Sequence, residues 1–445
     1  MKKKSILMAG IVTLLFAGCT SETQVEQPEV SIPIEFGTYV GNRQVTTRAE
    51  MTTATLKEKG FGLFVTYSTG SGTTDGTYAA SDGPNFMYNQ KVSAPSSGEF
   101  SYTPVKYWPN ETKTDGTTNG ATSSHKDVLS FFAYAPHVVN AEASGDDNVA
   151  DGTLKEASTS GITGITANNA TTDPKVTYTL PSRTGSDEDP AEVDLLWGVV
   201  PAETTSWSNV SGTAVTLTPG LPYLNLVKPN TTQKIVLSFK HALAKLTFGT
   251  IALANDVVGV SAEGNANVAS GTSIVVSEIS LSGTGIGKGI LNLNNTEAGV
   301  PLWEAATTPG TASFYAKVSG DQLAEAIKDA GAKKTQPTGV TKTAQSILAS
   351  STTAPGALLI PSSSQSVTVK IKYYTVTKDG NLLNGESRVE NEIEKTLTGL
   401  NLAGSKAYKI NIVIGMTSIK VDATVDDTWG DAGSQDVDLP ANKAS

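Results

Sequence analysis

Short apolar runs separated by Gly, Asn, Asp and Ser recur along most of the chain, and no other feature limits its fold so strongly. Such runs fit strands better than helices, because turn residues interrupt them and almost no helical periodicity lies between them. Strands joined by turns in this way are typical of antiparallel β-sandwiches. We predict strands over residues 61–67, 100–107, 128–134, 175–180, 234–239, 244–248, 273–281, 290–293, 356–360, 366–374 and 407–414.

The length of 445 residues exceeds what one hydrophobic core usually holds, so two domains are expected. A change of composition near residues 222–232 divides the chain into an N-terminal β-sandwich domain, 49–229, and a C-terminal one, 230–430. Segments rich in Thr, Gly and Asn are predicted to form long surface loops over 68–85, 110–124 and 140–173. The predicted class is therefore all-β, with one short helix over 321–333, where Leu323, Ala324 and Ile327 share a face.

Charge and composition exclude several functional classes. The chain has 33 Lys and Arg against 43 Asp and Glu, a net charge of −10, whereas nucleic-acid binding needs a basic surface. A single cysteine excludes an intramolecular disulfide framework and a cysteine-based zinc site. The three histidines, His125, His137 and His241, are far apart in the sequence. We expect no metal, no cofactor and no enzymatic activity.

Residues 1–18 have the layout of a secretory signal peptide, with three lysines followed by an apolar run from Ile6 to Gly18. As a helix this run spans only about 20 Å, less than a bilayer of about 30 Å. Its end resembles a bacterial lipobox, in which the signal is cut between Gly18 and Cys19 and the Cys19 thiol receives lipid. Phe16 stands where leucine is commonest. The alternative is an ordinary signal peptide with an incidental cysteine.

A first strand follows a polar tether over residues 20–29. Apolar and other residues alternate here, which indicates a strand with one buried face. Pro33 has no amide hydrogen to donate, so we expect this strand at the edge of a sheet. Each buried apolar side chain contributes about 1.5–3 kcal/mol, so removing this strand would expose a large apolar surface that another strand could cover. The predicted groove-filling residues are Val30, Ile32, Ile34 and Phe36.

Arginine is rare, since the chain has only four, and two of them, Arg43 and Arg48, directly follow this first strand. Arg48 lies among small polar residues, a context that a protease could enter. From the residues alone, ordinary loop arginines remain the alternative.

Other motifs carry weaker signals. The glycine-rich segment 283–289 lacks the spacing of a Walker loop and precedes a strand-like run, so we interpret it as a hairpin. Three acidic clusters lie in polar surroundings and are expected to be solvated loops, with weak calcium binding as the alternative. These clusters are Asp146-Asp147, Asp187-Glu188-Asp189 and Asp426-Asp427.

Taken together, the segments resemble the fimbrillin, or type V pilin, lipoproteins of Bacteroidales. The matching stretches, in order, are the lipobox at Cys19, residues 34–36, Thr47-Arg48-Ala49, and the segments 60–64, 107–109, 129–136, 193–198, 237–248 and 358–361. No single motif is decisive, but their order covers nearly the whole mature chain.

This resemblance implies two transthyretin-like β-sandwich domains and a subunit of a cell-surface fimbrium. The lipidated precursor would reach the outer membrane, where an arginine-specific protease cuts between Arg48 and Ala49 and removes residues 19–48. A strand from a neighbouring pilin subunit, identical or different, would then fill the emptied groove. His241 lies within a matching strand and is expected to be a packed or edge residue. The adhesive target is not indicated.

The candidate donor is the C-terminal tail, 431–445, which follows Trp429 and in which Val437 and Leu439 alternate with aspartates. The tail offers only two apolar side chains in place of the four on the displaced strand. Main-chain pairing or residues 419–425 would therefore have to supply the rest of the binding free energy. Two alternatives stay open. A surface-exposed polysaccharide-binding lipoprotein would carry an exposed platform of aromatic residues, and a cell-surface glycosidase would carry two carboxylates in a cleft.

Overall fold

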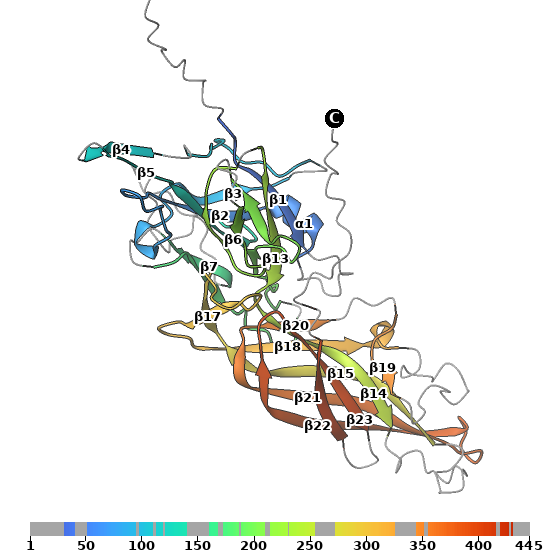
Figure 1. Ribbon diagram of the computed structural model, residues 1–445. Coiled ribbons are helices and arrows are strands. Elements are labelled where there is room, and N and C mark those ends of the chain that lie inside the picture. The colour runs from blue at the N-terminus through green and yellow to red at the C-terminus, as the bar shows by residue number, and fades with distance from the viewer. Residues whose placement is uncertain are drawn as a thin grey trace, which may run out of the picture.

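The computed structural model describes residues 31–40, 51–94, 98–109, 113–118, 121–139, 160–167, 172–186, 188–209, 214–229, 231–253, 272–324, 344–350, 355–414, 419–426 and Trp429. Strands dominate these residues, so the predicted all-β sandwich class is confirmed. Strands from the first half of the chain gather at one end of the molecule, and most of the strands from β14 to β24, but not β17, lie at the other (Figure 1).

The largest sheet contains the first strand of the chain at its edge. Its order is β1 (Glu35–Val40), β13 (Lys234–His241), β9 (Leu196–Val199), β6 (Val128–Ala135), β2 (Phe61–Ser68) and β3 (Met87–Val92), and β12 (Tyr223–Leu226) also pairs with β6. Only the β1–β13 pair of this sheet is parallel. Two separate hairpins are formed by β4 (Lys113–Thr118) with β5 (Ala121–His125), and by β10 (Ser206–Ser208) with β11 (Ala214–Thr216).

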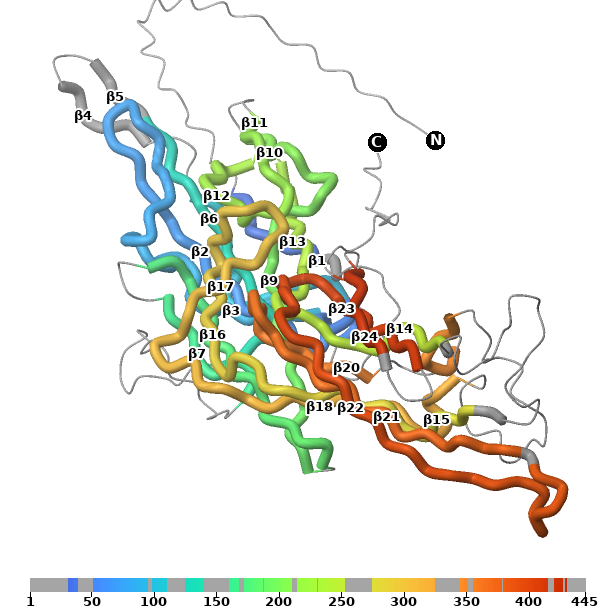
Figure 2. The backbone as a smooth tube through the Cα atoms, turned by 90° about the horizontal axis from the view of Figure 1, so that it is seen from below, coloured from blue at the N-terminus to red at the C-terminus, as the bar shows by residue number. Residues whose placement is uncertain are grey.

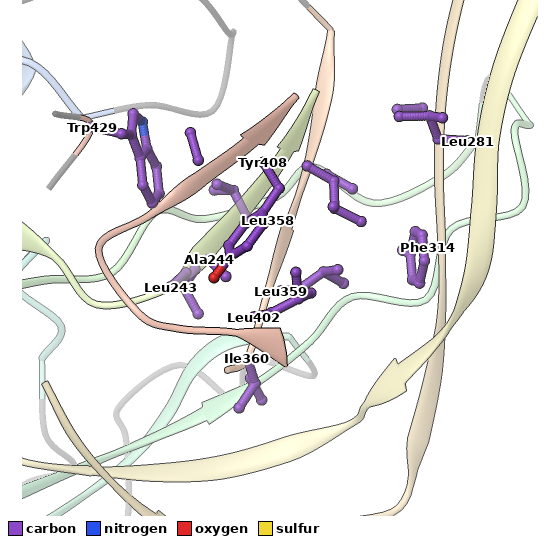
Figure 3. Close-up of a cluster of buried hydrophobic side chains, with 14 of the residues drawn as sticks. Leu243, Ala244, Leu281, Phe314, Leu358, Leu359, Ile360, Leu402, Tyr408 and Trp429 are labelled. Carbon is purple, nitrogen blue, oxygen red and sulfur yellow. The ribbon is translucent and has the colours of Figure 1, made fainter. Parts of the chain in front are cut away.

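Two sheets form the C-terminal end (Figure 2). One has the order β19 (Gln345–Ser346), β14 (Ala244–Leu253), β23 (Ala407–Ile414) and β24 (Ile419–Asp426), with β20 (Gly356–Leu359) also on β14. The other has the order β18 (Thr311–Ser319), β15 (Thr272–Ile286), β21 (Ser362–Lys378) and β22 (Glu386–Leu402). Both contribute to one core cluster, part of which is shown in Figure 3 with Trp429 at one side.

A fourth sheet joins early and late segments of the chain. Its order is β17 (Leu302–Ala305), β16 (Lys288–Asn292), β8 (Lys175–Thr179) and β7 (Gly161–Thr166), and β7 and β17 lie between the two ends of the molecule in Figure 1. Strand pairing thus crosses the predicted division at residue 230, because β13 belongs to the first sheet and β16 pairs with β8. Composition could not show this, since it does not report which distant strands pair.

The helices differ from the prediction. Helix α1 (Thr53–Lys59) was not predicted; Thr52 and Thr55 cap it reciprocally, and buried Leu56 is its only buried residue. About two turns of helix in a Thr-rich segment give too little periodicity to detect. At the predicted helix over 321–333, the described part holds a 3₁₀ turn, η2 (Gly320–Gln322), after which Leu323 pairs with Leu348. Residues 325–333 lie outside the described part. A second 3₁₀ turn, η1, covers Ala80–Asp82.

Several loop and strand predictions need correction. Residues 100–107 form no strand, and within them only Ser101 and Tyr107 make isolated bridges. The half-buried Phe100 and Tyr102 instead pack against the core cluster that contains Phe36 and Phe61. Conversely, the predicted loops 110–124 and 140–173 contain β4, β5 and β7. The prediction of a glycine-rich hairpin over 283–289 is wrong: Gly287 separates β15 from β16, but β15 pairs with β18 and β21 whereas β16 pairs with β8 and β17, so the chain passes here from one sheet to another. A Cβ at Gly287 would lie 3.0 Å from the backbone of Thr311.

The first sheet is buried on both faces. In β6, Leu129, Phe131 and Ala133 belong to one core cluster, whereas Phe132 and Tyr134 belong to the other. The same division holds in β2 and β9. Burial on both faces explains why the run from Val128 to Ala135 is apolar almost throughout instead of alternating.

A buried carboxylate lies where β20 meets the segment before β9. The Glu192 side chain is 5 % exposed, and its Oε1 lies 3.5 Å from Arg183 Nη1 and accepts a 3.3 Å hydrogen bond from the Leu358 amide. Burial raises the pKa of Glu192 to about 7, although Arg183 and the Leu358 amide oppose that shift. The folded protein therefore holds a proton that the unfolded chain releases between about pH 4.5 and 7.

We predict that Glu192→Gln removes a pH dependence of stability. Since the native state binds more protons in that window, its free energy of unfolding falls as the pH rises through it. Above the window, the glutamine variant should be more stable than the parent by about 1–3 kcal/mol. Urea unfolding at a series of pH values measures this, with Glu99→Gln as control because Glu99 is 86 % exposed. A variant less stable than the parent at alkaline pH would contradict the prediction.

Candidate functional site

The N-terminal segment lies in a groove at the edge of the first sheet. β1 is the first strand of that sheet, which confirms the predicted edge position, although the regular strand begins at Glu35, later than predicted. Ile32, Ile34 and Phe36 are 7 %, 1 % and 3 % exposed, so the predicted alternation is correct. Val30 lies outside the described residues.

Two different segments hold this N-terminal segment by main-chain hydrogen bonds. Residues 32–34 run antiparallel to residues 106–108: the Ile34 amide donates to the Lys106 carbonyl at 2.9 Å, and the Trp108 amide donates to the Ile32 carbonyl at 3.0 Å. Pro33, opposite Tyr107, occupies the position between these two bonds, where no donor is required. The proline therefore costs this pairing no hydrogen bond.

Residues 35–40 then pair in parallel with β13, from Glu35 opposite Lys234 to Val40 opposite Phe239. β9 occupies the other side of β13. Removing β1 would leave one edge of β13 without a partner, and an unpaired edge accepts another strand.

Aromatic rings line the groove around Phe36. Its ring centroid lies 5.5 Å from that of Tyr102, 6.2 Å from Phe131 and 6.3 Å from Phe61, all in edge-on geometry. The Tyr102 hydroxyl donates a 2.9 Å hydrogen bond to the Ile34 carbonyl, and burial raises the pKa of Tyr102. Trp108 continues the cluster toward Trp207, at 5.5 Å between centroids. Three buried side chains represent about 4–9 kcal/mol of burial.

Charged groups lie only at the rim of the groove. Lys234 Nζ is 3.1 Å from Glu99 Oε1 and 4.0 Å from Glu35 Oε2, and all three side chains are more than a third exposed. Exposed pairs of this kind contribute little to stability. Apolar burial and main-chain pairing therefore dominate the retention of β1.

The predicted cleavage site, Arg48 and Ala49, lies outside the described residues, as do Gly18 and Cys19. The chain just after it is anchored to the body by contacts beyond those that α1 makes with β1. The Met51 amide donates to buried Asp194 Oδ2 at 3.0 Å, Met51 is 7 % exposed, and Leu56 of α1 is fully buried. Loss of the preceding residues would leave the hydrogen bond between Met51 and Asp194 in place, whereas α1 would lose its contacts with β1.

Asp194 also connects β13 with the end of the described chain. His241 Nδ1 lies 2.8 Å from the same Oδ2 atom, and the His241 ring stacks on that of Trp429 at 4.3 Å and 10°. His241 is thus a packed residue at the end of β13, as predicted. Asp194, Met51, Tyr102 and Trp108 were not predicted as groove or anchor residues; the matching segments 107–109 and 193–198 contain Trp108 and Asp194 but indicated no role for them.

The two predicted tail residues, Val437 and Leu439, lie outside the described residues. Residues 419–425, which were expected to assist the tail, form most of β24 and pair with β23 over its full length. While that pairing lasts, this segment is used within its own sheet and cannot also act as a donor.

The described residues do not show the aromatic platform expected of a polysaccharide-binding lipoprotein. All five tryptophans are described and none is exposed, and Tyr107, at 51 %, is the only exposed tyrosine among those whose exposure is described. No aromatic platform for a polysaccharide is therefore present in this part of the chain.

Acidic clusters also gave no metal site within the described ranges, where no group of three His, Cys, Asp or Glu could hold an ion. Asp189 instead accepts hydrogen bonds from the Thr184 and Gly185 amides at 2.8 and 2.7 Å and closes its own turn. Asp426 pairs with Lys409 at 3.0 Å. Among the residues described, no helix is long and apolar enough to cross a membrane.

The structure is similar to that of a fimbrial protein from Bacteroides vulgatus, with a TM-score of 0.52 and 20 % sequence identity over 89 % of this chain and 99 % of that one. A fimbrilin from Porphyromonas gingivalis aligns with a TM-score of 0.32 and 10 % identity over 88 % and 96 % of the two chains. No protein-family model matches the sequence. No curated protein matches it either. The first similarity confirms the expected likeness at the level of the fold.

We predict that Phe36→Ala destabilises the precursor by about 3 kcal/mol, because the ring fills a closed aromatic pocket. Chemical unfolding of the uncleaved protein measures the change. Val105→Ala is the control, since Val105 is 50 % exposed and its truncation should cost less than about 0.5 kcal/mol. Equal effects of the two substitutions would show that β1 contributes little to the fold.

Proposed function

We propose that this protein is a structural subunit of a cell-surface fimbrium and that it polymerises by exchange of the strand in the β13 groove. The observation that carries the proposal is a separable strand. Residues 32–40 bury three apolar side chains and pair with two segments, and the chain after the predicted cut has an anchor outside β1, because the Met51 amide binds Asp194. The fold shared with a fimbrial protein supports it.

Export and maturation complete the proposal. Cys19 would carry the lipid that retains the precursor at the outer membrane, and an arginine-specific protease would cut between Arg48 and Ala49. The incoming strand would have to run parallel to β13 and present apolar residues at alternate positions, because those are the features of the strand that it replaces. Repeated between subunits, such a contact does not close on itself and builds a fibre.

We predict that the double variant Arg43→Ala/Arg48→Ala accumulates as an uncleaved precursor and forms no fibres. The groove then stays filled, so no donor can enter. Amino-terminal sequencing and electron microscopy of surface material measure the two effects. The single variant Arg43→Ala serves as control and should begin at Ala49 and polymerise normally. Fibres of normal length from the double variant would exclude cleavage as the trigger.

The tail provides the candidate donor. We predict that deletion of residues 431–445 leaves a protein that folds and is cleaved but stays monomeric, because Val437 and Leu439 would be missing from the neighbour's groove. Size-exclusion chromatography after cleavage measures this. Val437→Asp/Leu439→Asp should have the same effect without shortening the chain, whereas Lys443→Ala should have none. Fibres as resistant to detergent as the parent's, formed by the deletion variant, would place the donor elsewhere.

A further inference from the structure

Three residues with complementary chemistry meet on one face of the sheet that joins the two ends of the molecule. Lys175 of β8 and Asn292 of β16 are directly opposite each other in an antiparallel pair. Their Cα atoms are therefore about 5 Å apart and their side chains share a face. Glu304 of β17 is opposite Ile290, which puts it diagonally next to Asn292 on that same face.

The Glu304 carboxylate bridges the amine and the amide. Lys175 Nζ donates a 2.7 Å hydrogen bond to Glu304 Oε2, and Asn292 Nδ2 donates a 2.9 Å hydrogen bond to Glu304 Oε1. One carboxylate therefore binds both nitrogens that an amide exchange would involve: the attacking nitrogen, Lys175 Nζ, and the leaving nitrogen, Asn292 Nδ2. A carboxylate in this position can carry protons between them.

The orientation of the Asn292 amide is fixed by further contacts. Nδ2 also donates to Asp173 Oδ2 at 3.2 Å, and Oδ1 accepts a 2.9 Å hydrogen bond from the Asn294 amide. Only one assignment of the amide nitrogen and oxygen satisfies two carboxylates on one side and a main-chain donor on the other. Asp173 is held in turn by the Tyr78 hydroxyl at 2.8 Å.

This arrangement suits acyl transfer. The Asn294 amide points at the oxygen that would gain negative charge in a tetrahedral intermediate. Asn292 is 5 % exposed and the Lys175 side chain is 19 % exposed, so the two reacting groups are largely shielded from water, whereas the Glu304 side chain is 35 % exposed. Burial raises the pKa of Glu304, but hydrogen bonds from Lys175 and Asn292 outweigh it and lower the pKa below its usual value. Glu304 is therefore a carboxylate at neutral pH, the form that accepts a proton.

We propose that Lys175 and Asn292 form an intramolecular isopeptide bond with Glu304 as the proton-transferring group. Glu304 takes a proton from the Lys175 ammonium, and the neutral amine attacks Cγ of Asn292. Glu304 returns that proton to Nδ2 as the Cγ–Nδ2 bond breaks, and the former amine nitrogen then gives its second proton, through Glu304, to the departing ammonia. The product is a secondary amide between the two side chains, and the second nitrogen leaves as ammonium, so atoms and charge balance without any co-reactant.

Such a bond would join β8 and β16, strands that are far apart in the sequence, at the sheet between the two ends of the molecule. It does not depend on strand exchange, because none of its residues touches the β1 groove. A subunit under tension would gain a covalent link at this junction, where main-chain hydrogen bonds and core packing otherwise hold the strands.

Peptide mapping of the folded, full-length protein recovered from cells tests the proposal. The expected result is one branched peptide that contains Lys175 and Asn292 and whose mass is the sum of the two peptides less one ammonia. Lys175→Arg, Asn292→Ala and Glu304→Gln should each give two separate peptides. Lys175→Arg keeps the ion pair with Glu304, so it separates loss of the bond from loss of the fold.

Glu392→Gln is the matched control, since Glu392 pairs with Lys370 at 2.6 Å on the neighbouring sheet, and the branched peptide should persist in this variant. Separate peptides from the parent protein, even after prolonged incubation of the folded chain, would overturn the proposal. So would a loss of ammonia confined to the Asn292 peptide, because a succinimide loses ammonia without joining two peptides.

Discussion

The backbone hydrogen bonds along the outer edge of β13 are the constraint on which the rest of this structure depends. β9 satisfies one side of β13, and the other side is satisfied only by β1. The same strand directs Ile235, Leu237 and Phe239 into the core that Phe36 completes. The free main-chain groups of β13 need hydrogen-bond partners, and its apolar side chains need apolar neighbours. Whatever occupies this edge therefore has to be an extended strand with apolar residues at alternate positions.

The groove keeps its shape because its sheet is buried on both faces. β2, β6 and β9 send alternate side chains into two different cores, so the wall of the groove is supported from behind by a cluster to which the C-terminal sheets also contribute. If the edge strand left, Phe61 and Phe131 would lose their contacts with Phe36, whereas the contacts on the far face of the wall would remain. Those remaining contacts would support the groove as a template for another strand.

The sheet formed by β7, β8, β16 and β17 has a different task. It combines strands from before and after β13, so the two ends of the molecule are tied by main-chain ladders as well as by a shared core. Glu192 and the Lys175–Glu304–Asn292 cluster both lie on connections between early and late segments of the chain. Polar chemistry thus gathers at the junction, whereas the groove is almost wholly apolar below its rim.

The sequence by itself determined the all-β class, most strand positions, the edge location of the N-terminal segment and the alternation of Ile32, Ile34 and Phe36, because these follow from local periodicity and from the missing amide hydrogen of Pro33. Local pattern also wrongly predicted a strand over 100–107. Phe100 and Tyr102 are aromatic because they pack against the core, and the segment that carries them forms no strand. Only the tertiary structure decided that β1 runs parallel to β13, that Asp194 anchors Met51 and His241, and that Lys175 lies opposite Asn292. These contacts join residues more than a hundred positions apart, apart from the link between Asp194 and His241, and a side chain's chemistry does not specify its distant partner; packing and strand register do.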